Sequence, residues 1–105
     1  MAVIEITSEE QFVEILRNNA KVVANFTDTS SGPCKLINPV FKMLSEEYQD
    51  IVFVSVDVDK VASLARDFQV SAMPTFIMFR GGLTSDLVRG ANKGALEDKV
   101  KLFAA

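Results

Sequence analysis

Short apolar runs alternate along the chain with stretches whose apolar residues recur every three or four positions. Runs of the first kind favour β-strands, and they are found at Val3–Ile6, Lys21–Thr27, Ile51–Val58, Thr75–Arg80 and Leu87–Val88. Stretches of the second kind lie between and after them and predict four helices. The resulting order, βαβαβαββα, predicts an α/β sandwich with a mixed sheet.

Two of the predicted helices have recognisable details. The first follows Ser8, whose side chain can cap it, and Gln11 stands at the capping-box position. Its apolar stripe is Phe12, Val13, Ile15 and Leu16. The second follows the turn-rich residues 28–33 and contains Pro39, which should kink it. Its stripe is Leu36, Ile37, Val40, Phe41 and Leu44. The last two helices are predicted at Val61–Phe68 and Ala95–Phe103.

Composition excludes several kinds of chemistry. The 105 residues suit one domain, and they include a single cysteine, Cys34, and no histidine. An internal disulfide, a Cys/His zinc site and a histidine-based triad are therefore impossible. The net charge of −3 gives no basic field for nucleic acid. We see no signal peptide and no apolar run long enough for a membrane span, so we expect a cytoplasmic protein.

Several short segments, taken in order along the chain, resemble thioredoxins. They are GPCK at 32–35 with Pro39 in the following helix, VDVD at 56–59, AMPTF at 72–76, FRGG at 79–82 and GANK at 90–93. The resemblance covers residues 1–105 as a single domain. It implies the thioredoxin fold, a central mixed β-sheet flanked by helices on both faces, with Pro74 in the cis form.

The same resemblance implies a groove that binds substrate. Its residues would be Ser30, Gly32, Pro33, Met73, Pro74, Gly90 and Ala91. Met73 is the apolar residue that we place on the surface there, because a flexible thioether suits an adaptable contact.

The chain departs from the family where the family does its chemistry. Thioredoxins carry Trp-Cys-Gly-Pro-Cys, whereas residues 30–34 read Ser-Ser-Gly-Pro-Cys. Ser31 therefore stands in the place of the lost nucleophile, and we interpret it as a helix N-cap. Asn25 stands in the place of the family's buried acid, and Ser55 in that of its lysine. Two neutral groups there can hydrogen-bond each other or a water.

Cys34 matches the family's second cysteine and has two interpretations. In the first, serines at positions 30 and 31 leave it uncovered, and it forms a mixed disulfide with glutathione or a partner, or links two chains. It could instead be an inert, buried residue that packs as a small apolar group. The acids Asp57 and Asp59 resemble a metal pair, but we interpret them as capping or solvated residues, and we expect no metal or cofactor.

Three hypotheses remain open. The first is a thioredoxin-like protein that binds polypeptides or thiol partners at the cis-Pro groove, with any redox chemistry through Cys34. The second is a monothiol, glutathione-dependent disulfide oxidoreductase. The third is an engineered or inactivated thioredoxin, although changes at Asn25 and Ser55 favour natural divergence. Partners would be protein or glutathione thiols and disulfides, and thioredoxin reductase only if activity is retained. We expect a monomer or a Cys34-linked dimer.

Overall fold

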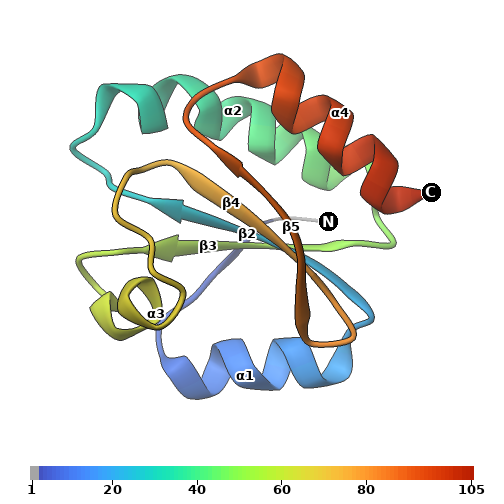
Figure 1. Cartoon of the computed structure of the whole chain (residues 1–105), viewed down its shortest axis with the longest axis horizontal. Helices are drawn as coiled ribbons and strands as arrows, with labels where there is room; N and C mark the ends of the chain where they lie inside the picture. Colours follow the sequence, from blue (N-terminus) through green and yellow to red (C-terminus); the bar gives the residue numbers. More distant parts are fainter. Residues whose placement is uncertain (1–2) are drawn as a thin grey trace.

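The computed structural model describes residues 3–105, over which a five-stranded sheet has the order β1-β3-β2-β4-β5 (Figure 1). The strands are β1 (Ile4–Glu5), β2 (Lys21–Thr27), β3 (Val52–Asp57), β4 (Thr75–Arg80) and β5 (Leu83–Arg89). The helices are α1 (Glu9–Asn18), α2 (Gly32–Glu47), α3 (Ala62–Asp67) and α4 (Lys93–Ala104). Strands β1, β3 and β2 run parallel, and β2, β4 and β5 pair antiparallel. The predicted mixed sheet and order of elements are confirmed.

Helices cover both faces of the sheet. Helices α2 and α4 pack on one face, where Phe41 and Leu96 join a cluster with Val23 and Phe76 of the strands. Helices α1 and α3 pack on the other face, where Phe12 and Leu64 join a second cluster. Figure 1 shows the two pairs of helices on opposite sides of the strands. The central mixed sheet with helices on both faces, which the resemblance implied, is therefore confirmed.

Capping at Ser8 is also confirmed. The Gln11 backbone N–H donates to Ser8 Oγ at 3.1 Å, and the Gln11 side chain accepts from the Thr7 backbone N–H at 2.6 Å. These two bonds satisfy backbone donors that the start of α1 would otherwise leave free.

The most extended difference from the predicted elements is β5, which covers seven residues instead of two. Its first half contains Thr84, Ser85 and Asp86, and polar residues of this kind do not give the apolar run by which we recognised strands. They form a strand because they pair with β4 at the edge of the sheet, where Thr84 and Ser85 are exposed to solvent. A register shift at Met78/Phe79 of β4 accompanies this pairing.

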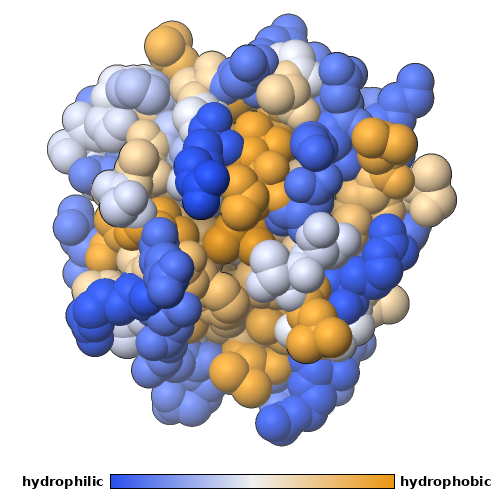
Figure 2. Space-filling model, viewed as in Figure 1, coloured by the Kyte–Doolittle hydropathy of each residue, from blue (hydrophilic) through white to orange (hydrophobic). Residues whose placement is uncertain are grey.

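Two residues that we placed on buried helical stripes are exposed. Leu36 of α2 is 78% exposed and Val13 of α1 is 46% exposed. In α2 the inward row is Cys34, Ile37, Phe41 and Leu44, all of them buried. Leu36 lies about 100° around the helix from Ile37 and so points away from the sheet. The stripe predicted from sequence was wider than the real contact. Figure 2 shows hydrophobic residues at several places on one face of the molecule, beside hydrophilic ones.

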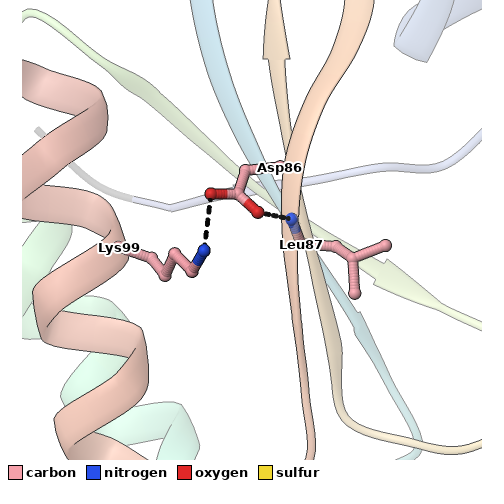
Figure 3. A network of polar contacts seen from close by, with 3 residues as sticks. All are labelled: Asp86, Leu87 and Lys99. Atoms are coloured by element: carbon pink, nitrogen blue, oxygen red, sulfur yellow. Dashed lines mark hydrogen bonds and ion pairs between the residues drawn. The ribbon is translucent and has the colours of Figure 1, made fainter.

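An ion pair joins β5 to α4. Lys99 Nζ lies 2.9 Å from Asp86 Oδ2, and the Leu87 backbone N–H donates to Asp86 Oδ1 at 2.8 Å (Figure 3). The hydrogen bond from Lys99 is the main reason why the pKa of Asp86 lies below its ordinary value, and the Leu87 bond adds to it. The loop over residues 90–92 connects these two elements, and the ion pair forms a second link between them. Among residues 3–105, no helix is long and apolar enough to cross a membrane.

Candidate functional site

Three loops meet at one end of the strands. Strand β2 ends where the antiparallel strand β4 begins, since Phe26 pairs with Thr75. Strand β5 ends at the same place, because Thr75 also pairs with Arg89. The loops after β2, before β4 and after β5 are therefore neighbours, as their common side in Figure 1 shows. The Gly90 backbone N–H donates to the Pro74 carbonyl at 2.9 Å and ties two of them together.

The loop after β2 is organised by Asp28, a residue that our sequence reasoning did not single out. Its Oδ1 accepts from the Ser30 backbone N–H at 2.9 Å and from Ser30 Oγ at 2.7 Å. These bonds, the backbone one first, hold the pKa of Asp28 below its ordinary value. The sequence did contain a signal for this role. Asp side chains in turns commonly accept a hydrogen bond from the backbone N–H two residues further on, and Ser30 stands at that position.

Ser31 occupies the N-cap position of α2 in extended conformation, as predicted, but its side chain makes no capping hydrogen bond. Its carbonyl accepts from the Lys35 backbone N–H at 3.1 Å, which begins the helix. A serine hydroxyl ionises far too weakly for a helix dipole to activate it, and the chain has no histidine to act as its base. Ser31 therefore has neither the acidity nor the base that it would need to act as a nucleophile.

Cys34 is 0% exposed, so the expectation that serines at positions 30 and 31 uncover it is wrong. The thiol lies on the inward row of α2 with Ile37 and Phe41, and it is buried although serines stand at those two positions. Its Sγ accepts a long hydrogen bond of 3.4 Å from the Asp28 backbone N–H. Of the two interpretations of Cys34, this burial favours the packing role.

The loop before β4 contains a cis peptide bond between Met73 and Pro74. Thr75 Oγ1 donates to the Ala72 carbonyl at 2.7 Å and holds the loop closed. Among the described residues, no hydrogen-bond partner contacts the backbone N–H or carbonyl of Met73, whose side chain is half-buried. Beside it, Gly90 has a φ of +88°, a conformation that favours glycine.

A polar cleft lies under α2, on the side of β1. Asn25 and Ser55 are paired across β2 and β3, and Glu5 is paired with Ser55 across β1 and β3. Asn25 does not bond Ser55 as one of our expectations had it, because its Nδ2 donates to Asn38 Oδ1 of α2 at 2.9 Å. Asn38 was missed, since a lone polar residue on a helix before a proline gives no signal of what it faces.

The cleft contains two buried polar atoms without a partner among the described residues, Asn25 Oδ1 and Thr27 Oγ1. Two cavities of about 260 and 390 Å³ lie against these residues and share Glu5, Asn38 and Ser55. The oxygen and nitrogen of the Asn25 side-chain amide can be assigned in two orientations. In either orientation, one of these two atoms has no hydrogen-bond partner among the described residues. A cleft of this size with such atoms suits ordered water.

The acids after β3 serve the chain's own backbone. Asp57 Oδ1 accepts from the backbone N–H groups of Asp59 at 2.9 Å and Lys60 at 3.3 Å. Asp57 therefore caps the turn after β3, whereas the N-cap of α3 is Val61, which has no side-chain capping bond. Within residues 3–105, no group of three or more His, Cys, Asp or Glu side chains is placed to hold a metal ion.

Comparison with known proteins gives a consistent result. The family model described as Thioredoxin matches residues 3–102. The chain is 43% identical over 99 residues to the thioredoxin of Equus caballus, covering 92% of this chain and 94% of that one. It is 42% identical over 85 residues to thioredoxin H2-2 of Oryza sativa subsp. japonica, covering 81% of this chain and 63% of the longer rice protein. The structure of Plasmodium falciparum thioredoxin superposes with a TM-score of 0.94 at 34% identity, covering 96% and 99% of the two chains.

Proposed function

This chain belongs to the thioredoxin family, and from that premise we propose that it binds extended polypeptide segments at the Met73–Pro74 loop without dithiol chemistry. The single observation that carries the proposal is the state of the two cysteine positions. Position 31 is a serine, and the one thiol, Cys34, is 0% exposed. Thiol–disulfide exchange needs an accessible thiolate to attack a disulfide sulfur, and neither position supplies one.

Free backbone groups support the binding half of the proposal. An extended peptide pairs with a receptor through main-chain hydrogen bonds, and the backbone of Met73 offers a donor and an acceptor that no described residue uses. Gly32 and Pro33 at the start of α2 and Ala91 in the loop after β5 are exposed and carry no charge. Ser30 and Ser31 replace a bulky aromatic and a thiol, which leaves a surface that is smaller and more polar there than in the family pattern.

The polar cleft under α2 agrees with the loss of redox chemistry. The family pattern has a buried acid at the position of Asn25, and a carboxamide cannot take up a proton at neutral pH. A chain whose only thiol, Cys34, is buried and takes no part in disulfide exchange has no use for such an acid. An unpaired, reduced thiol also fits a reducing compartment, so the cytoplasm remains our proposed location.

The chemical half is tested by thiol titration and by insulin reduction. We expect Cys34 to react with a chromogenic disulfide only after unfolding in guanidinium. We expect no reduction of insulin with thioredoxin reductase and NADPH, nor with glutathione. Turnover with glutathione that Cys34→Ser abolishes would instead establish the monothiol oxidoreductase. Activity gained by Ser31→Cys alone would identify a thioredoxin inactivated at one position.

The binding half is tested with a probe that cannot form a disulfide, the carboxamidomethylated insulin B chain. In an NMR titration we expect shifts at residues 30–33, 72–74 and 90–91. Met73→Glu should weaken the interaction, whereas Leu83→Glu, which adds the same charge at a residue 74% exposed on β5, should leave it unchanged. Shifts elsewhere, or equal effects of the two substitutions, would contradict the proposal.

A further inference from the structure

The outer side of α2 carries two large apolar side chains that are mostly exposed, with a half-buried one between them. Leu36 is 78% exposed and Met43 is 67% exposed, and the half-buried Val40 lies between them. Their spacing places all three on one side of the helix, over a length of about 10 Å at 1.5 Å per residue. Large exposed apolar side chains grouped in this way mark interaction surfaces more often than scattered ones do.

This row of side chains borders a groove between two helices. Val40, Met43 and Leu44 of α2 line one wall, and Lys93 and Glu97 of α4 line the other, around a volume of about 380 Å³. Figure 1 shows the two helices side by side on the same face of the sheet. We call this surface, with Glu46, Glu47 and the adjoining Leu36, the α2–α4 groove.

The charges around the groove are unbalanced. Glu46, Glu47 and Glu97 line it, against the single cation of Lys93. Within residues 3–105, none of the three carboxylates is in an ion pair, because the two pairs that form join Arg17 to Glu14 and Lys99 to Asp86. An apolar strip beside free carboxylates is complementary to a partner that is apolar on one side and basic at its margins.

We propose that the α2–α4 groove docks a basic amphipathic helix of a partner protein. A helix fits because a groove between two helices accepts side chains spaced three, four and seven residues apart. Its apolar side covers Leu36, Val40 and Met43, and its lysines or arginines meet Glu46, Glu47 and Glu97. This surface is separate from the Met73–Pro74 loop, so the chain can hold an extended segment and a helix at two different places.

The probe is a fluorescein-labelled model peptide of leucine and lysine, about 16 residues long and patterned as an amphipathic helix. A second peptide has glutamate in place of every lysine. Fluorescence anisotropy should show saturable binding of the basic peptide and none of the acidic one. Met43→Lys should weaken binding about tenfold or more, and Glu47→Gln should weaken it less and flatten its dependence on salt.

The matched control is Leu83→Lys, which adds the same charge at a residue 74% exposed that lies outside the groove. Its affinity should equal that of the unsubstituted protein. The proposal is overturned if Met43→Lys and Leu83→Lys have equal effects, if both peptides bind alike, or if neither saturates. NMR shifts confined to residues 30–33, 72–74 and 90–91 would also overturn it, and would leave the function proposed for the Met73–Pro74 loop intact.

Discussion

The two faces of the sheet are built by the same strands and serve different purposes. Toward α1 and α3, β2 and β3 present Val22, Ala24, Phe26, Val54 and Val56, all buried and apolar. Toward α2, the alternate residues of the same strand ends are Asn25, Thr27, Ser55 and Asp57, all buried and polar. Burying polar groups costs free energy that an apolar face avoids. At these strand ends the α2 side is polar and the α1 side apolar, although Val23 and Phe53 further along the strands join an apolar core on the α2 side as well. We therefore expect the α1 side to contribute more to stability at these ends, and the function that we propose lies on the α2 side.

Removing an aromatic ring from the α1 side should give the largest effect. Phe79 is 1% exposed, and its ring contacts those of Phe12 and Phe68 edge to face at 5.6 and 5.3 Å between centroids. Phe79→Ala should lower the free energy of unfolding by about 3–5 kcal/mol. Urea unfolding followed by circular dichroism measures it, with Phe79→Leu as the milder control. A loss below about 1 kcal/mol would mean that this face is not the stabilising one.

What could be predicted from the sequence follows the same division. The elements and most of the α1-side core were predictable because apolar runs and helical periodicity report on burial, although Val13 of α1 proved to be exposed. On the α2 side, resemblance located positions 25, 31 and 34 but not their surroundings. The Asn25–Asn38 bond and the burial of Cys34 depend on how α2 lies over the sheet, and that is a tertiary contact. Leu36 was misplaced because a wide apolar stripe on a helix does not reveal which edge lacks a partner.

The substitution Asn25→Asp places a carboxyl group on the α2 side and tests how much a buried charge there lowers stability. In Asn25→Asp, burial should raise the pKa of the new carboxyl, with no lysine at position 55 to offset it. The folded state then holds its proton more tightly than the unfolded state. Stability relative to the unsubstituted protein is therefore lost as pH rises above the ordinary Asp pKa of about 3.9, by about 1.4 kcal/mol for each unit of pKa difference.

Urea unfolding of Asn25→Asp at several pH values measures this loss. Asn25→Leu serves as its control, because leucine cannot titrate and its effect should not change with pH in this range. If Asn25→Asp is destabilised equally near pH 4 and near pH 7, then water or another group in the cleft stabilises the new carboxylate, and its pKa is not raised.

Asn25→Leu also makes a smaller prediction of its own. The substitution removes the hydrogen bond to Asn38, and it also removes the buried Oδ1 that has no partner among the described residues. These contributions oppose each other, so stability should change by about 1 kcal/mol or less. The half-buried Asn38 can bond to water instead. A loss as large as that of Phe79→Ala would mean that the polar face contributes as much to stability as the apolar one.

The smallest effect on stability is expected from the exposed ion pair between β5 and α4. The side chains of Asp86 and Lys99 are 43% and 42% exposed, so solvent screens their ion pair. Asp86→Asn should cost about 0.2–1 kcal/mol. Because the pKa of Asp86 is lowered in the folded state, its contribution is present above the ordinary value and disappears as pH falls through the lowered one. The difference between the two proteins in urea unfolding should therefore shrink with acid and with added salt. A difference that persists under both conditions would place the role of Asp86 in its bond to the Leu87 backbone, since an asparagine can replace that acceptor only in one of its orientations.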